Sequence, residues 1–176
     1  MSKRVVTFGE IMLRLTPPNH KRFVQAESLD VTYGGAEANV AVSLANYGLD
    51  AHYVTKVPNN LIGQAAINHL CRFGVNTDYI VRGGPRLGIY FQEIGAAQRP
   101  SRIVYDRAGA SIAEAKPEEF NWEEILAGAT WFHVTGITPA LSPTAAQTTI
   151  DAVSTAKKVG VTVSIDLNYR KNLWTP

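Results

Sequence analysis

A glycine pair followed by small and apolar residues, GGAEANVAVSLANYG at positions 34–48, constrains the fold more than any other stretch. Glycine tolerates backbone conformations that other residues avoid, and it lets the main chain approach a ligand closely. The run after the pair predicts a helix that ends at Gly48 and is apolar almost all round. A helix of that kind is buried on most of its surface. The stretch therefore predicts a helix at the centre of the fold, entered through a glycine hinge.

Asn39 lies in the first turn of this predicted helix, directly after the hinge at Gly34 and Gly35. A buried amide needs hydrogen-bond partners, and the start of a helix offers free N–H groups to an oxygen-rich ligand. The pattern therefore predicts a ligand site around the hinge. An Asn39 that only holds the backbone of its own loop explains the same spacing, because a glycine pair alone is a weak signal.

Length and composition indicate an ordinary globular chain. Its 176 residues fit one domain or a piece of a larger one, and 45% of them are apolar. The net charge of +2 comes from 17 basic and 15 acidic side chains without long runs of either sign, so no nucleic-acid or membrane partner is expected. The opening MSKRVVTFGE turns polar too early for a signal peptide. With a single cysteine there is no disulfide framework, and a reducing cytoplasm is the expected location.

The first half of the chain alternates between predicted strands and helices. Apolar runs at 4–8, 51–57 and 77–81 predict buried strands, and the segments 34–48 and 61–73 have helical periodicity. An alternation of this kind is typical of an α/β fold, with a mainly parallel, doubly wound sheet flanked by helices.

The alternation breaks at residue 87. The segments 87–95 and 102–109 predict two strands joined by a turn, and neither is apolar throughout, so each has one face away from the core. Side chains alternate along a strand, and Tyr105 and Arg107 therefore share a face. A solvated sheet face explains this arrangement as well as a ligand site does.

Polar residues follow the last predicted strand. A strand at 130–134 and a helix at 143–158 precede the strand 161–168, which brings Asn168 and Arg170 to its carboxyl end. Ligands of open α/β sheets bind outside the carboxyl ends of the strands. These two side chains are therefore better candidates for a site than polar residues elsewhere.

Several stretches together resemble the ribokinase-like, PfkB-type carbohydrate kinases: VTFGEIMLRLTP near the start, the glycine-pair helix, HVTGITPALSP at 133–143 and DLNYRKNLW at 166–174. The resemblance covers all 176 residues in order, and it is greatest to the members that phosphorylate 2-keto-3-deoxygluconate. It implies that residues 1–176 are the N-terminal part of one ribokinase-like domain. The segments of about 11–33 and 87–108 would then form a small β-lid over the sugar, and the lid would join copies of the chain into a homo-oligomer.

The resemblance also implies a site and an activity. The activity is ATP- and Mg²⁺-dependent phosphorylation of a sugar acid, 2-keto-3-deoxygluconate, to its 6-phosphate. Asn168 and Arg170 would contact the phosphates of ATP, and Arg170 would also reach the sugar acid. The residues implied to bind the sugar acid are Gly34, Gly35, Asn39, Tyr90, Tyr105, Arg107 and Arg170.

The chain departs from the family pattern at one point. The Gly-Ala-Gly-Asp turn that carries the catalytic base of such kinases is absent from these 176 residues, and no P-loop replaces it. No catalytic residue is therefore expected within residues 1–176. A polypeptide of these residues alone should bind sugar better than it transfers phosphate.

Two alternatives remain open at this stage. One is a kinase of a neutral sugar, such as a fructokinase, and the other is a sugar-binding module without catalysis. Arg107 and Arg170 favour the acid, because a planar guanidinium matches a carboxylate and a neutral hexose has none.

Overall fold

A parallel sheet forms the body of the molecule. The structure, a computed structural model, describes residues 3–174. The sheet has the strand order β10-β9-β1-β4 and all of its pairs are parallel. This arrangement confirms the predicted α/β class. The strands are β1 (Arg4–Phe8), β4 (Asp50–Val54), β9 (Ala129–Thr135) and β10 (Thr162–Asp166).

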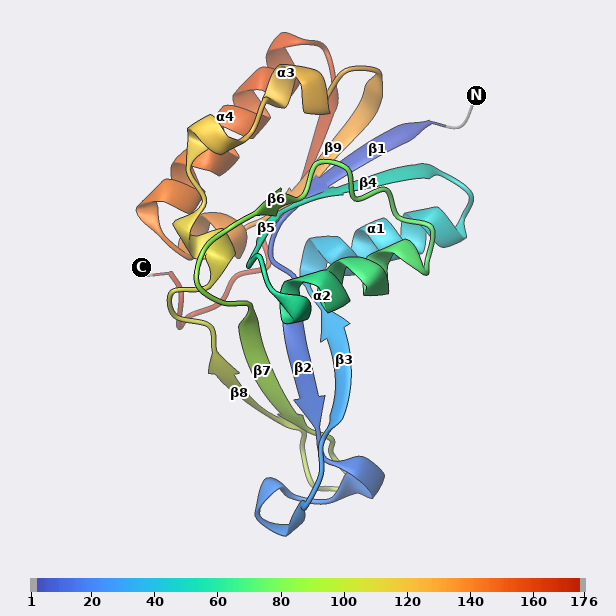
Figure 1. Ribbon diagram of the computed structural model, residues 1–176, viewed down its shortest axis with the longest axis vertical. Coiled ribbons are helices and arrows are strands. Elements are labelled where there is room, and N and C mark those ends of the chain that lie inside the picture. Colours follow the sequence, from blue (N-terminus) through green and yellow to red (C-terminus); the bar gives the residue numbers. More distant parts are fainter. Residues whose placement is uncertain (1–2, 175–176) are drawn as a thin grey trace.

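A second four-stranded sheet extends away from the body, at the bottom of Figure 1. We call it the projecting sheet. Its strands β7 and β8 pair antiparallel, as the sequence predicted, and β7 pairs parallel with β2. In the order β3-β2-β7-β8, the strands are β3 (Asp30–Gly34), β2 (Met12–Thr16), β7 (Gly88–Glu93) and β8 (Arg102–Asp106).

Helices cover both faces of the parallel sheet. In Figure 1, α1 and α2 lie on one side of it and α3 and α4 on the other. Asn60 and Ser142 cap two of these helices, because their side chains accept hydrogen bonds from the first turns of α2 and α4. The helices are α1 (Ala36–Asn46), α2 (Leu61–Cys71), α3 (Trp122–Ile125) and α4 (Pro143–Lys158). Short 3₁₀ turns are Pro18–His20, Phe23–Gln25, Ser111–Glu114, Pro117–Glu119 and Thr138–Ala140.

The region after α2 differs from the sequence prediction. The expected strand at 77–81 shrinks to β6 (Val81–Arg82), which pairs with β5 (Lys56–Val57) outside the main sheet. The Asn76 side chain accepts a hydrogen bond from the Asp78 N–H at 3.0 Å, and this turn replaces the start of the strand. The expected strand 51–57 is likewise split between β4 and β5.

Helix α1 also differs, because only one of its faces is buried. It packs on β1, β4 and β9 through a narrow stripe that includes Ala38 and Ala41, while Asn39 and Ser43 are exposed. The prediction of a helix buried on most of its surface, with Asn39 as a buried amide, was therefore wrong. The buried polar group of the first turn is Glu37, which is 1% exposed.

The body has two apolar cores, one on each side of the sheet. An aromatic cluster of Phe8, Phe120, Trp122 and Phe132 fills the side of α3 and α4 with edge-on and stacked rings. Tyr53 and others fill the side of α1 and α2. Within residues 3–174, no helix is long and apolar enough to cross a bilayer.

Candidate functional site

The candidate site lies where the two sheets meet. The chain passes from β1 through residues 9–11 into β2, and from β3 through Gly34 and Gly35 into α1. Met12 at the start of β2 pairs with Gly34 on one side and with Gly88 on the other. The glycine hinge therefore lies beside the first residues of two neighbouring strands, at the carboxyl end of β1.

Gly35 is needed here for space. Its backbone is extended, with a φ of −175°, so its conformation does not require glycine. A Cβ at this position would overlap the main-chain oxygen of Glu10 and lie 3.3 Å from the Cα of Ile11. The hinge thus permits the start of α1 to pack directly on the backbone of residues 10–11.

Gly35→Ala is expected to lower the free energy of unfolding by about 1 to 3 kcal/mol, because the added methyl group must displace main-chain atoms. Urea unfolding followed by circular dichroism measures this change. Gly83→Ala is the matched control, since a Cβ there has only an ordinary contact of 3.5 Å with the Lys56 side chain. Equal stability of the two variants would show that the hinge has no need of glycine.

Two predicted site residues, Tyr90 and Asn39, lie close to a third, Gly34. A Cβ on Gly34 would lie 3.0 Å from the Tyr90 hydroxyl and 3.8 Å from the Asn39 Oδ1, so both polar groups point at the hinge. Tyr90 is paired across the strands with Tyr105, and their ring centroids are 6.0 Å apart. The Tyr90 hydroxyl from β7 and the Asn39 amide from α1 therefore converge on the space beside Gly34, which has no side chain of its own.

Arg107 follows β8 and turns back toward the body of the molecule. Its guanidinium lies 5.6 Å from the centre of the Tyr105 ring and forms an ion pair with Glu10. The side chain of Arg107 is 14% exposed and that of Glu10 is 3% exposed. Glu10 was not predicted as a site residue. The signal that could have found it is its position directly after β1, where ligands of open α/β sheets bind.

The Glu10 carboxyl has an unusual electrostatic environment. Burial raises its pKa to about 7, even though the guanidinium of Arg107 lowers it, and the charge of Glu37 adds a further increase. Its Oε1 has no hydrogen-bond partner among the described residues. A carboxylate that is dehydrated and half-satisfied in this way is easily protonated near neutral pH.

A cavity of about 480 Å³ brings three predicted residues together at this junction. Tyr105 and Arg107 reach it from the projecting sheet, and Arg170 reaches it from the segment after β10. Lys171 adds a third cationic residue to the lining. The lining of the cavity therefore includes one aromatic ring and three cationic side chains, of which Arg107 is already paired with Glu10. The remaining lining residues are Met12, Ile137, Asn172 and Leu173.

The segment after β10 places its two predicted residues differently. Arg170 lines the cavity, but Asn168 does not. Asn168 has a φ of 41°, and its N–H donates to the Asp166 side chain at 2.9 Å. Trp174 anchors the segment, since its Nε1 donates to the Gly136 oxygen at 2.8 Å.

Glu37 fixes the start of α1, a role that the sequence analysis also missed. Its Oε1 accepts hydrogen bonds from the Thr135 N–H at 3.1 Å, the Thr135 hydroxyl at 2.7 Å and the Thr138 hydroxyl at 3.1 Å. Burial raises the pKa of this carboxyl. The first turn of α1 is thereby tied to the end of β9. The sequence signal that could have predicted this role is that Glu37 is an acidic residue within the otherwise mostly apolar run 36–45.

The whole site lies within a stretch of recognisable family sequence. The model of the pfkB family carbohydrate kinases matches residues 2–176. The chain belongs to this family. Its fold is accordingly ribokinase-like, as the sequence resemblance implied.

Three relatives of this pfkB-family chain are informative. A 2-dehydro-3-deoxygalactonokinase of Haloferax volcanii is 40% identical over 100% of the chain and 55% of its own length. The crystal structure of a 2-dehydro-3-deoxygluconokinase from Thermotoga maritima superposes with a TM-score of 0.97 at 64% identity, over 98% of the chain and 53% of that structure. A fructokinase from Xylella fastidiosa with bound ATP superposes at 0.83 with 26% identity, over 99% and 55%. The chain thus spans about half the length of these relatives.

No group of three histidine, cysteine, aspartate or glutamate side chains within residues 3–174 is arranged to hold a metal ion. A Mg²⁺ ion that is bound by one or two carboxylates and by the phosphates of a nucleotide does not require such a group. Arg170 and Asn168 lie at the carboxyl end of β10, where an anionic phosphate fits by charge, but they do not form an enclosed nucleotide site.

Proposed function

We propose that this pfkB-family chain supplies the sugar site of an ATP-dependent sugar-acid kinase, and that the substrate is 2-keto-3-deoxygluconate, converted to its 6-phosphate. The observation that carries the proposal is the cavity between the sheets, where Arg107 and Arg170 face one volume beside Tyr105. Guanidinium groups match the planar carboxylate of a sugar acid, and they find no such partner on a neutral hexose. The names of the two kinases of keto-deoxy sugar acids among the relatives support the same substrate class.

In this proposal, the remaining site residues contact different parts of the sugar. Gly34 leaves room for the ligand beside the main chain, and Gly35 lets the start of α1 pack closely on residues 10–11. The Asn39 amide and the Tyr90 hydroxyl bond the hydroxyl groups of the ligand. Such a division is chemically consistent, since the neutral polar groups converge on the hinge and the cations on the cavity.

ATP is the proposed phosphate donor, with Mg²⁺ as its counter-ion, and it supplies the transferable phosphoryl group. Arg170 and Asn168 are proposed to contact its phosphates from the end of β10. Phosphoryl transfer depends on positioning and charge stabilisation. The contribution of residues 1–176 is then to hold the sugar acid in place, with its carboxylate anchored on arginine.

Calorimetric titration of the intact protein with 2-keto-3-deoxygluconate and with fructose tests this proposal. We expect the acid to bind and fructose to bind at least about tenfold more weakly, the value of one hydrogen bond to a charged group. Equal affinity for the two sugars would favour the second candidate, a neutral-sugar kinase. The ion pair of Arg107 with Glu10 gives that candidate its support, because it already satisfies part of the guanidinium.

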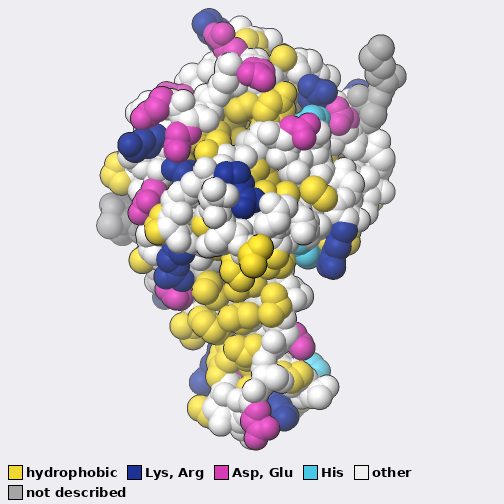
Figure 2. Space-filling model, in the orientation of Figure 1, with side chains coloured by type: hydrophobic (Ala, Val, Ile, Leu, Met, Phe, Trp, Pro, Cys, Tyr) yellow, Lys and Arg dark blue, Asp and Glu magenta, His cyan; other side chains and the backbone are white. Residues whose placement is uncertain are grey.

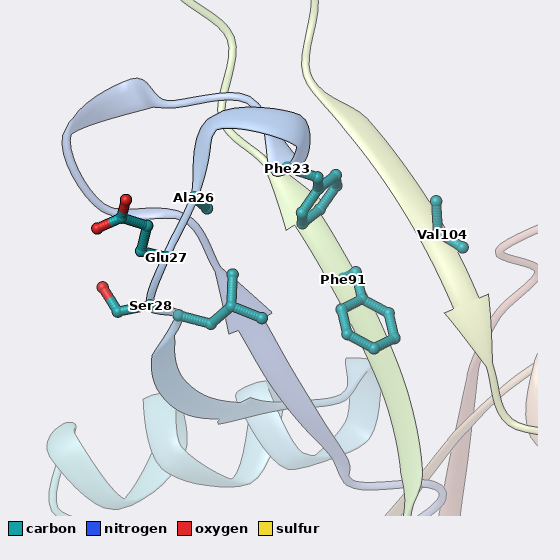
Figure 3. A pocket seen from close by; sticks show the side chains of 7 residues that line it. Phe23, Ala26, Glu27, Ser28, Phe91 and Val104 are labelled. Carbon is teal, nitrogen blue, oxygen red and sulfur yellow. The ribbon is translucent and has the colours of Figure 1, made fainter.

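We also propose that a second copy of the chain covers the projecting sheet. Figure 2 shows hydrophobic side chains over much of the visible face of this sheet. A hollow of about 610 Å³ lies on one face, where Phe23 and Phe91 meet edge-on with centroids 6.2 Å apart and Val104 stands on the neighbouring strand (Figure 3). Val31 and Val104 are more than half exposed, at 59% and 56%. An apolar sheet face with an open edge is usually covered by a partner.

Val104→Asp is expected to shift the intact protein from a dimer or higher oligomer toward the monomer, because a charge on this face opposes its burial. Sedimentation velocity at micromolar concentration measures the change. Val159→Asp is the control, since Val159 is 48% exposed but follows α4 on the body of the molecule. A wild-type protein that sediments as a monomer would refute the proposed interface.

A further inference from the structure

Glu10 lies in direct contact with the proposed anchor of the sugar acid, yet no role for it follows from the proposed function. It is the second residue after β1, and its carboxyl is enclosed at the junction of the two sheets. A Cβ on Gly88 would overlap its Oε1, so glycine at the start of β7 leaves room for this carboxyl. The fold thus reserves a buried place for an acid directly beside Arg107.

The pair is satisfied on one side only. Glu10 Oε2 accepts a hydrogen bond from an Nη of Arg107, whereas Glu10 Oε1 and Arg107 Nε have no partner among the described residues. Two other titratable groups are coupled to Glu10: Glu37 from α1, whose charge raises the pKa of Glu10, and Tyr53 from β4, whose own pKa is raised by the charge of Glu10. Arg107 is therefore the cation that stabilises a negative charge on Glu10 within this cluster.

An incoming carboxylate competes with Glu10 for the same guanidinium. Two carboxylates on one arginine repel each other, and like charges within a few ångströms disfavour ionisation of the more buried group. The ligand keeps its charge, because a carboxylic acid beside a keto group titrates well below neutral pH. Glu10 is therefore the carboxylate that becomes protonated, since burial already disfavours its charged form.

Building on the proposed function, we propose that Glu10 is a positioning residue that orients Arg107 in the free site and takes up a proton when Arg107 binds the carboxylate of the sugar acid. The free site keeps its arginine paired and correctly placed. The bound site holds a neutral Glu10 acid, so that the guanidinium has one anionic partner at a time.

Proton uptake by Glu10 makes the affinity for the sugar acid decrease as the pH rises. With a pKa of about 7 in the free protein, Glu10 is largely protonated at pH 6 and largely ionised at pH 8. When Arg107 pairs with the ligand instead of with Glu10, the pKa of the Glu10 carboxyl rises by about 1 to 3 units. In the complex this pKa is then about 8 to 10, and below it Glu10 is mostly protonated. Binding at pH 8 then takes up between about half a proton and one proton, and the affinity at pH 8 is about five- to tenfold weaker than at pH 6.

Calorimetry on the intact wild-type protein is the first test. Titration with 2-keto-3-deoxygluconate at pH 8 in buffers of different ionisation enthalpy reports the number of protons taken up per ligand. The inference expects a clear uptake that disappears at pH 6. Binding with no proton uptake at either pH would show that Arg107 serves both carboxylates at once, and the inference would be wrong.

Two variants give an independent test. Glu10→Gln imitates the protonated acid, so its affinity at pH 8 should equal its affinity at pH 6 and be about five- to tenfold tighter than that of the wild type at pH 8. Asp106→Asn is the matched control, because Asp106 neighbours Arg107 in sequence but is exposed and paired with Arg86. This control should keep the pH dependence of the wild type.

The outcomes separate this inference from the proposed function. If fructose binds as tightly as the sugar acid, the proposed function fails, and the inference fails with it. If the acid binds selectively but with the same affinity at pH 6 and pH 8, only the role of Glu10 is refuted. Should Glu10→Gln fold poorly, the wild-type proton uptake still decides the question.

Discussion

A polypeptide limited to residues 1–176 is expected to phosphorylate 2-keto-3-deoxygluconate about four to seven orders of magnitude more slowly than the related full-length kinases. The sequence contains no Gly-Ala-Gly-Asp turn. The family resemblance implies that this turn carries the general base and leads into a helix whose start stabilises the transferring phosphate. Loss of a general base costs about two to four orders of magnitude, and loss of an anion-stabilising donor about two to three more.

A coupled assay for ADP release on the purified polypeptide measures this loss. Calorimetric binding of the sugar acid to the same sample is the control, because it separates missing chemistry from a misfolded site. Fusion to the C-terminal half of the Thermotoga maritima relative, which is 64% identical over the shared part, should restore turnover. Ordinary kinase turnover by residues 1–176 alone would contradict the prediction.

Arg107→Ala, in an enzyme that contains this chain and such a C-terminal half, is expected to raise the Michaelis constant for the sugar acid about ten- to hundredfold. A hydrogen bond to a charged group contributes about 1.5 to 3 kcal/mol, which corresponds to that range. A neutral analogue that lacks the carboxylate should be almost unaffected. Steady-state kinetics with both substrates provide the measurement.

The partner of Arg107 needs to be controlled in this experiment. Arg107→Ala leaves the carboxyl of Glu10 buried without its cation, so part of the effect could come from local instability. The double variant Glu10→Gln/Arg107→Ala removes that charge and should keep the raised Michaelis constant. Arg107→Lys retains the charge but not the two-pronged geometry, and it should fall between the wild type and Arg107→Ala.

Arg102→Ala is the matched control for this series, because Arg102 is an exposed arginine at the start of β8, the strand that Arg107 follows. It should leave both Michaelis constants unchanged. An equal loss for the acid and for its neutral analogue in Arg107→Ala would mean that Arg107 only supports the projecting sheet. The physical argument against a neutral-sugar kinase would then be lost.

The sequence by itself determined the fold class and the family. Apolar runs of strand length between helical segments are local patterns, and they predicted the parallel sheet that β1, β4, β9 and β10 form. Side-chain alternation in a strand is equally local, and it predicted that Tyr105 and Arg107 share a face. In the structure both residues line one cavity, and Arg107 follows the end of β8. Motif order and spacing sufficed for the family.

Tertiary structure decided which polar groups are buried and what they contact. Asn39 and Glu37 are both polar residues in the first turn of α1, and residue type alone does not show which of them is buried. Glu37 is buried because it lies on the face of α1 that packs on the sheet, whereas Asn39 is exposed. The turn at 76–78 likewise shortened a strand that apolar composition had predicted, so that only β6 remains.

The ion pair between Glu10 and Arg107 joins residues that are 97 positions apart in the chain. No local pattern contains such a contact, because it exists only where the end of β1 meets the end of β8 between the two sheets. The charge that a buried carboxyl carries depends on its loss of water and on its neighbours in space. For that reason the sequence could suggest Arg107 as a partner for a proposed sugar acid, but only the packed structure could show that Arg107 is already paired with Glu10.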